Sequence, residues 1–204
     1  MSMNIPSGIE YIIGIDEVGR GPLAGPVTLG FVVIKPEDVK YLPEGVTDSK
    51  KLSEKKRELL SEEFIRLKKE GKINIYTKSV PATTIDKIGI SPSIKKCIKA
   101  GLDSAKVDPK NTMVYLDGGL YALDEWINQE TIIKGDASNV LIGAASIFAK
   151  VYRDRYMVKL GEECGDYGFE KHKGYGTKAH REAIIEKGPC EYHRLSYCKN
   201  ILGK

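Results

Sequence analysis

Three short apolar runs in this chain each lead into an acidic side chain. The first ends at Asp16 and Glu17, the second, at residues 113–116, ends at Asp117, and the third is followed by Asp136 after a lysine and a glycine. Runs of this length are typical of buried strands, and an unpaired carboxylate at the edge of a core is costly to desolvate. Because clustered carboxylates usually bind a cation, and hard oxygen ligands suit Mg²⁺ or Mn²⁺, the pattern favours a divalent-metal site of a kind that acts on phosphate esters.

Each acid on its own has a plainer explanation, which is solvated surface charge. Adjacent side chains on a strand point to opposite faces, so Asp16 and Glu17 meet one ion only where the strand ends or twists, and a glycine two residues later favours this. The matching positions of Asp117 and Asp136 make the metal site the better interpretation. Asp154 stands inside a predicted helix between two arginines, and we expect a structural ion pair there.

Length and charge restrict the class of protein. A chain of 204 residues fits one domain, and its net charge of +4 permits nucleic-acid binding without arguing for it. No run approaches the roughly 20 apolar residues that span a bilayer, and the amino terminus lacks a signal pattern. We therefore expect a cytoplasmic protein.

The four cysteines form no Cys-x-x-Cys pair, so reduced thiols are the simplest expectation. A zinc site remains as an alternative, although its spacing fits no familiar zinc pattern. Its ligands would be Cys190, His193 and Cys198 with Cys164 or His172.

The hydrophobic periodicity predicts an α/β domain with a mixed sheet. One helix should carry an apolar stripe of Leu59, Leu60, Phe64 and Leu67, and residues 121–126 should form a short turn and helix. In open sheets of this kind ligands gather beyond the carboxyl ends of the strands, where the acids lie. Strands are expected at about residues 10–16, 27–34, 73–80, 113–117 and 131–133, and helices at about 53–69, 84–105 with a break near 89–92, 139–160 and 178–187.

A glycine-rich segment follows the first pair of acids. Residues 19–24 satisfy the dinucleotide-binding fingerprint G-x-G-x-x-A, but that fingerprint has to open a helix. Here Pro22 and Pro26 bracket the segment and a β-branched run follows, so we expect a turn that joins two strands. Its backbone amides are suited to approach a sugar or a phosphate closely, and a plain tight turn is the alternative.

Two further segments carry groups suited to a nucleic acid. A polar loop offers the hydroxyl of Ser49 and the ammonium groups of Lys50 and Lys51 to phosphate oxygens, with a solvated loop as the alternative. Residues 169–177 place Tyr175 between two glycines among cationic side chains, where an exposed ring can stack on a sugar or a base.

Taken together, these segments resemble ribonuclease HII, the type 2 ribonuclease H family. In the family's order, the matching stretches are residues 14–27, 48–52, 117–118, 134–136, 144–154 and 174–177. Of these, residues 14–27 and 144–154 are highly specific. Residues 188–197 look like the bacterial type of carboxyl end.

The resemblance implies a ribonuclease H-like fold, a mixed five-stranded sheet flanked by helices with a small helical carboxyl-terminal part. Residues 1–204 would form a single catalytic domain, in which residues from about 164 to 204 are a loop-and-helix extension that contacts the substrate. A monomer with no membrane association is expected, and an interaction with a sliding clamp is left open.

The implied activity is hydrolysis of the RNA strand of RNA/DNA hybrids and cutting on the 5′ side of ribonucleotides embedded in duplex DNA. The products would carry a 5′-phosphate and a 3′-hydroxyl, and the roles would be ribonucleotide removal from DNA and RNA primer removal. The resemblance places the catalytic metal ligands for Mg²⁺ or Mn²⁺ at Asp16, Glu17, Asp117 and Asp136. It assigns sensing of the ribose 2′-hydroxyl to Gly19, Arg20 and Gly21, packing on the sugar beyond the junction to Tyr175, and further substrate contacts to Ser49, Lys50, Lys51, Ser146, Lys150 and Lys173.

Two rival functions stay open at this point. Another nuclease or integrase-like enzyme of the same broad fold would share the acid cluster but would not require a 2′-hydroxyl. A nucleic-acid-binding module with a degenerate catalytic site would bind without turnover, although the presence of all four acids argues against it.

Overall fold

A five-stranded mixed sheet organises the protein, whose computed structural model describes residues 5–203. The strand order is β3-β2-β1-β4-β5; β1 pairs antiparallel with β2, β2 antiparallel with β3, and β1, β4 and β5 run parallel. This confirms the expected sheet. The strands are β1 Tyr11–Val18, β2 Val27–Ile34, β3 Ile73–Val80, β4 Thr112–Asp117 and β5 Gln129–Ile132.

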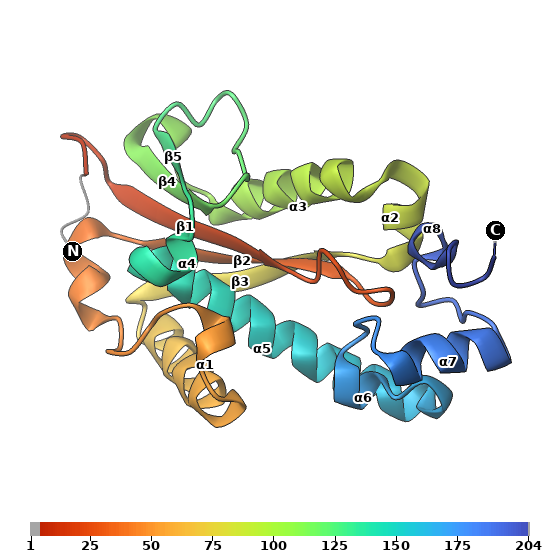
Figure 1. Ribbon diagram of the computed structural model, residues 1–204. Coiled ribbons are helices and arrows are strands. Elements are labelled where there is room, and N and C mark those ends of the chain that lie inside the picture. Colours follow the sequence, from red (N-terminus) through yellow and green to blue (C-terminus); the bar gives the residue numbers. More distant parts are fainter. Residues whose placement is uncertain (1–4, 204) are drawn as a thin grey trace.

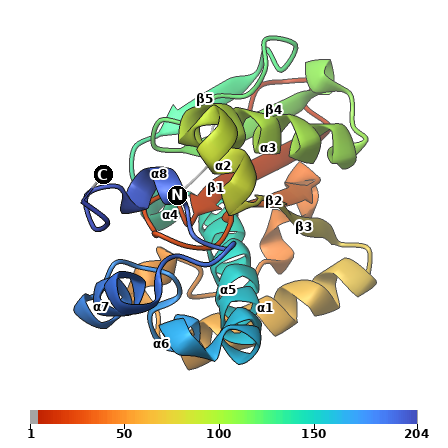
Figure 2. The ribbon, with the colours of Figure 1, turned by 90° about the vertical axis from the view of Figure 1, so that its right-hand side faces the viewer.

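Helices cover both faces of the sheet. Helices α2 and α3 lie on one face, α1 and α5 lie on the other, and α6, α7 and α8 gather at one end (Figure 1, Figure 2). The helices are α1 Glu54–Lys69, α2 Ala82–Ile88, α3 Ile90–Ala105, α4 Gly135–Ser138, α5 Val140–Glu163, α6 Phe169–His172, α7 Lys178–Lys187 and α8 Leu195–Cys198, and the short 3₁₀ turns are η1 Pro36–Tyr41, η2 Ser49–Lys51, η3 Pro109–Asn111 and η4 Gly165–Tyr167.

Alternation along the strands sorts the core into two layers. On β1, Ile13 and Ile15 pack with α3, whereas Ile12 packs with α1 and α5. Two glycines let α5 lie directly on the sheet, because a Cβ at Gly14 or at Gly30 would collide with the backbone of that helix. The close approach brings the first turns of α5 beside the carboxyl end of β1.

Two local expectations were wrong in part. Residues 121–126 form the expected turn, in which the Trp126 N–H donates to the Leu123 carbonyl, but no helix. The Gln129 side chain accepts from the Ala122 N–H and donates to the Trp126 carbonyl, so side-chain bonds replace helical ones. In α1, Leu59 is 52% exposed and does not join the buried stripe. The expected break near residue 89 is confirmed, since Gly89 at φ +83° separates α2 from α3.

The carboxyl-terminal segment packs against the far end of α5. Met157 and Leu160 of that helix form a small core with Phe169 and with Ala24 of the loop between β1 and β2. We call residues 19–26 of this loop the glycine loop. It lies between the sheet and helices α6–α8 (Figure 1), so the acids at the end of β1 are connected through it to the carboxyl-terminal segment.

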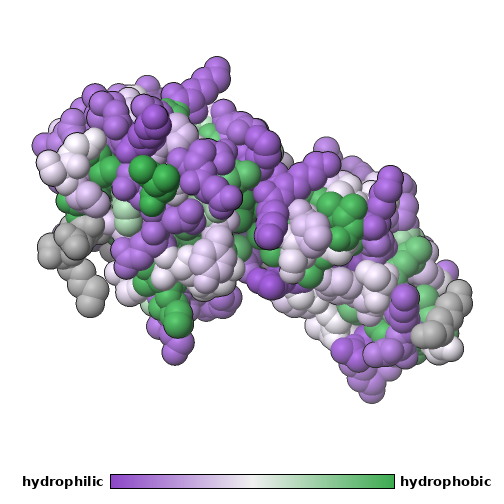
Figure 3. Space-filling model, turned by 90° about the horizontal axis from the view of Figure 1, so that it is seen from above, coloured by the Kyte–Doolittle hydropathy of each residue, from purple (hydrophilic) through white to green (hydrophobic). Residues whose placement is uncertain are grey.

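Hydrophilic residues cover most of the face seen in Figure 3, where apolar residues are scattered and do not form a band. Within residues 5–203 no helix has both the length and the apolar character needed to cross a bilayer.

Candidate metal and substrate site

Asp16 lies near the end of β1 on the face that α5 covers. Its side chain is buried, and it accepts a hydrogen bond from the Glu17 backbone N–H at 2.7 Å. Burial raises the pKa of Asp16 to about 8, and the carboxylates of Asp117 and Glu17 add to the rise. The group is therefore under strong pressure to bind a proton or a cation at neutral pH.

Asp117 ends β4, the parallel neighbour of β1. Its Oδ1 accepts from the N–H groups of Gly135, at 2.7 Å, and Asp136, at 3.4 Å, so the start of α4 folds back onto this carboxylate. Asp136 is buried beside it as a result. Burial raises the pKa of Asp136, and the nearby Asp117 and Asp48 raise it further.

The four predicted ligands share one electrostatic environment. The charge of Asp117 raises the pKa of Asp16, of Glu17 and of Asp136, so these three carboxylates lie within the electrostatic influence of Asp117. Two cations oppose the carboxylates: Arg20 lowers the pKa of Glu17, and Lys50 has its Nζ 3.8 Å from Asp136 and its side chain 81% exposed. Burial lowers the pKa of Lys50, but the surrounding carboxylates outweigh this and the net shift is upward.

The donor set fits a divalent ion. All four side chains offer carboxylate oxygens, which are the ligands that Mg²⁺ and Mn²⁺ prefer. Across residues 5–203, no three His, Cys, Asp or Glu side chains already converge with metal-holding geometry. The carboxylates raise one another's pKa, and this mutual repulsion is of the kind that a bound cation would relieve.

Outside this cluster, the zinc alternative finds no support in the described part of the chain. Cys190 Sγ lies 3.1 Å from His193 Nδ1. Cys198 packs separately, against Leu23 and Ile184.

The glycine loop presents an open face next to the acids. Gly19 has φ +86°, and a Cβ there would collide with the Arg153 side chain, whereas a Cβ at Gly21 would meet nothing within 4 Å. Arg20 pairs with Glu17 at 3.3 Å and is otherwise largely exposed. The expected turn between two strands is confirmed.

Tyr175 is held close to this loop by the backbone on either side of it. Leu23 donates to the carbonyl of Gly174 at 2.9 Å, while the Tyr175 carbonyl accepts from His180 Nδ1 at 2.9 Å. The residue is 43% exposed. Its carbonyl is thus anchored while the residue stays partly open to solvent.

The side chains of the remaining predicted substrate contacts differ in their exposure and in their hydrogen bonds within the protein. Ser49 is buried, and its hydroxyl forms a 2.9 Å hydrogen bond with the Ser146 hydroxyl. Lys51 is exposed, and Lys173 donates from Nζ to the Glu170 carbonyl. These substrate contacts stay predictions.

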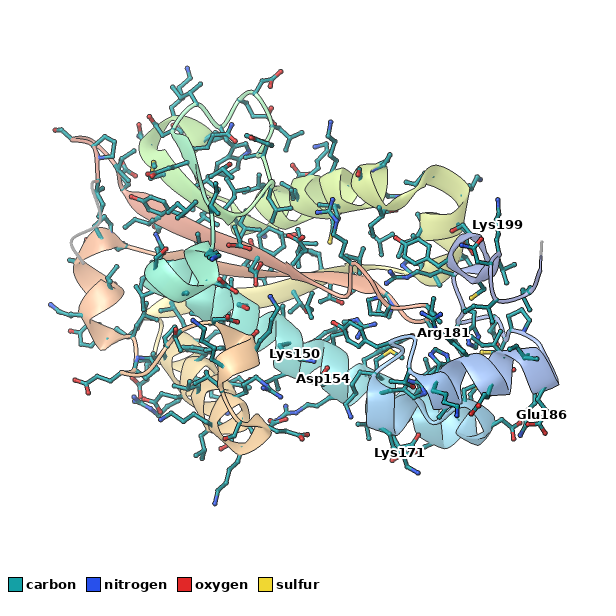
Figure 4. The ribbon with its side chains drawn as sticks, in the orientation of Figure 1. Lys150, Asp154, Lys171, Arg181, Glu186 and Lys199 are labelled. Atoms are coloured by element: carbon teal, nitrogen blue, oxygen red, sulfur yellow. The ribbon has the colours of Figure 1, made fainter. Side chains whose placement is uncertain are left out.

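Asp154 forms the expected ion pair, but with Lys150 at 2.7 Å and not with an arginine (Figure 4). The reason is that Arg153 points into the interior and Arg155 pairs with Glu58 on α1. Lys150, predicted as a substrate contact, is therefore paired within α5.

Two buried arginines escaped the sequence reasoning. Arg153 donates to the carbonyls of Pro26, Ala24 and Lys173, and Arg194 donates to other carbonyls of the glycine loop. Burial lowers the pKa of Arg153 to about 10 and also lowers that of Arg194. A signal existed only for Arg153, which stands one helical turn before the inward-facing Met157.

Comparison with known proteins identifies the family of the chain. The family model for ribonuclease HII matches residues 13–200. A ribonuclease HII from Caldicellulosiruptor bescii is 46% identical over 196 residues, which covers 96% of this chain and 90% of the relative. The crystal structure of the ribonuclease H2 from Pyrococcus horikoshii OT3 is 26% identical with a TM-score of 0.74, covering 94% of this chain and 96% of that one. The structure of Bst-RNase HIII in complex with Mn²⁺, at 18% identity and a TM-score of 0.66 over 97% of this chain and 71% of that one, shares the fold. The chain therefore belongs to the ribonuclease HII family, metal-dependent endonucleases of the ribonuclease H class that act on RNA paired with DNA.

Proposed function

We propose that this protein cuts on the 5′ side of ribonucleotides embedded in duplex DNA and hydrolyses the RNA strand of RNA/DNA hybrids, leaving a 5′-phosphate and a 3′-hydroxyl. The observation that carries the proposal is the position of the four-carboxylate cluster beside the open glycine loop. A cluster of metal-binding carboxylates alone is compatible with many nucleases. An adjacent main-chain turn with room for a sugar indicates an enzyme that distinguishes ribose from deoxyribose.

Asp16, Glu17, Asp117 and Asp136 would hold Mg²⁺ or Mn²⁺. When bound, a divalent ion lowers the pKa of a coordinated water and stabilises charge on the phosphate oxygens. Ser146 lowers the pKa of Asp16 and so favours its charged form, and the N–H groups at the start of α4 orient the Asp117 carboxylate. Lys50 lies at the edge of the cluster, where its exposed ammonium group would neutralise a substrate phosphate.

The glycine loop and Tyr175 would read the sugar. Gly21 leaves open space in front of the loop backbone, and a 2′-hydroxyl can both donate and accept hydrogen bonds there. The exposed ring of Tyr175 would pack on the deoxyribose that follows the ribonucleotide. Such specificity would serve ribonucleotide removal from DNA and removal of RNA primers. An interaction with a sliding clamp stays a prediction.

The decisive experiment uses a labelled DNA duplex with one ribonucleotide, incubated with and without Mg²⁺, and maps the cut. We expect a single Mg²⁺-dependent cut on the 5′ side of the ribonucleotide and no cut in the matched all-DNA duplex. Cleavage of the all-DNA duplex would instead indicate a nuclease without ribose recognition. Binding without turnover in Mg²⁺ and in Mn²⁺ would indicate a binding module.

A further inference from the structure

Arg194 is a fully buried cation whose guanidinium hydrogen-bonds to main-chain carbonyls of the glycine loop. It donates to the carbonyls of Gly19 at 2.6 Å, Arg20 at 2.9 Å and Gly25 at 2.9 Å. The ion pairs found among residues 5–203 do not include Arg194. Burying an unpaired cation is costly, so these bonds have to offset a substantial desolvation cost.

Because of the geometry of the peptide bond, these contacts also fix the direction of the N–H groups on the opposite side of the loop. A trans peptide is planar, and its N–H points away from its C=O. Because Arg194 holds the carbonyls of Gly19 and Arg20, the following N–H groups, those of Arg20 and Gly21, point to the side away from the guanidinium. Neither N–H has an acceptor within the described residues, and the space at Gly21 is open.

Arg194 is itself fixed by its neighbours. Asp86 on α2 accepts from the N–H groups of Leu195 at 2.7 Å and Ser196 at 3.0 Å, which ties the start of α8 to the sheet domain. The Tyr197 ring lies 5.2 Å from the guanidinium carbon, and its hydroxyl donates to the Arg20 carbonyl at 3.3 Å. The carboxyl-terminal segment thus places the planar guanidinium of Arg194 against a loop more than 160 residues away in sequence.

We propose that Arg194 is a positioning residue for ribose recognition: it fixes the Gly19 and Arg20 peptides so that the N–H groups of Arg20 and Gly21 donate to the 2′-hydroxyl oxygen at the cut site. This inference rests on the proposed function. A guanidinium is required because its planar fork reaches several carbonyls at once, whereas the ammonium group of lysine is a single compact point.

The test compares Arg194→Lys with the wild type on two duplexes. Arg194→Lys should lower kcat/KM for the single-ribonucleotide duplex by about ten- to a hundredfold, because two hydrogen bonds to the sugar are misaligned. The Ki of an all-DNA duplex, used as a competitive inhibitor, should change less than about twofold, since phosphate contacts dominate its binding.

A destabilised control separates positioning from folding. Leu102→Ala removes a buried side chain of α3, away from the loop, and it should lower Tm while leaving both kcat/KM and Ki close to wild type well below Tm. Equal changes of kcat/KM and Ki in Arg194→Lys, or a loss in Leu102→Ala as large as in Arg194→Lys, would overturn the proposal.

A milder variant covers the case in which Arg194→Lys does not fold. Tyr197→Phe keeps the ring beside the guanidinium and removes only the hydroxyl that bonds the Arg20 carbonyl. It should lower kcat/KM for the ribonucleotide duplex by about two- to fivefold with an unchanged Ki, and an unchanged kcat/KM would count against the proposal. Failure of the proposed function is distinguishable, because the wild type would then cut the all-DNA duplex or cut neither.

Discussion

At the scale of single residues, the acidic side chains of the cluster could be predicted from the sequence, whereas the buried arginine that holds the glycine loop could not. Asp16 and Asp117 were predictable because a carboxylate directly after a buried strand is costly without a partner, and both lie in the shared cluster. Arg194 was not predictable, because its role comes from contacts with a loop far away in sequence, and no local pattern encodes such contacts. Short sequence motifs therefore indicate the carboxylates, whereas the side chains that hold the neighbouring loop in place can be identified only from the tertiary fold.

The carboxylate cluster predicts opposite effects on stability and activity. Asp117→Asn should raise the Tm of the metal-free protein, because it removes a charge that Asp16, Glu17 and Asp136 all feel. It should also reduce the rise in Tm that Mg²⁺ or Mn²⁺ produces by binding the folded state. Turnover should fall by about a thousandfold or more, since losing a ligand charge costs on the order of several kcal/mol of transition-state stabilisation.

Thermal melts with and without Mg²⁺ check this, and Asp154→Asn serves as the matched control. Asp154 is paired with Lys150 on α5, so its variant should keep both the metal-induced shift and most of the activity. A full metal-induced shift in Asp117→Asn would remove that residue from the metal site.

The two glycines of the loop should respond differently to a side chain. Gly21→Val should change the free energy of unfolding by less than about 1 kcal/mol, because its φ is not positive and the space beside it is open. It should nevertheless lower kcat/KM for the ribonucleotide duplex by about a hundredfold, because the side chain fills the space that the sugar needs. Gly19→Ala should instead destabilise the fold, since Gly19 has a positive φ and contacts Arg153. Urea unfolding and steady-state kinetics on both variants check this, and parallel losses in Gly21→Val would favour the plain-turn alternative.

At the scale of elements, long periodic segments were predictable and short ones were not. The bounds of β2, β3 and α7 agree with the sequence pattern, because a continuous β-rich run, a largely alternating run and a capped helix each leave few alternatives. The segment at residues 121–126 was mispredicted, since Gln129 competes for its backbone groups. Leu59 was misassigned because the apolar stripe of α1 is narrower than the run of leucines suggests.

His180 on α7 and His193, which precedes α8, form a pair that predicts a pH dependence. His180 Nε2 lies 3.0 Å from His193 Nε2, so one ring donates, the other accepts, and both are neutral. Burial lowers the pKa of each to about 4, and the positive field of His172 contributes. Since the pKa of unfolded histidine is about 6.5, the unfolded state binds more protons below that value, and stability should fall as the pH drops from about 6.5 towards 4.

Tm measured between pH 8 and pH 4.5 checks this prediction, with His180→Gln as the comparison. The variant lacks one of the two titrating rings, so its Tm should be lower at neutral pH but should fall less steeply on acidification. The other groups that face the pair are Tyr167, Phe169, Cys190 and the Tyr175 carbonyl. Identical slopes in the two proteins would show that the pair does not control acid stability.

At the scale of the whole molecule, the carboxyl-terminal segment and the sheet meet around the glycine loop. The loop donates to Gly174 and Tyr192 and accepts from the backbone of Arg194, so both sides of the proposed substrate site are fixed to it. The sequence resemblance predicted that this segment contacts the substrate, but the backbone bonds that hold it to the loop were beyond any local pattern. The relative position of the acids and Tyr175 thus depends on contacts between opposite ends of the chain.

This arrangement predicts that Tyr175 reads the junction through the face of its ring. Its carbonyl is already anchored by His180, and the residue is partly exposed, so its side chain is the part available to the substrate. Tyr175→Phe should keep much of the cleavage of a single embedded ribonucleotide, whereas Tyr175→Ala should lose about ten- to a hundredfold, because stacking contacts are worth about 1–3 kcal/mol. On a continuous RNA/DNA hybrid the loss should be smaller, since no ribose-to-deoxyribose junction has to be recognised there. Measuring kcat/KM for both variants on both substrates decides the question. An alanine variant equally impaired on the two substrates, or a phenylalanine variant as poor as alanine, would mean that the ring does not read the junction.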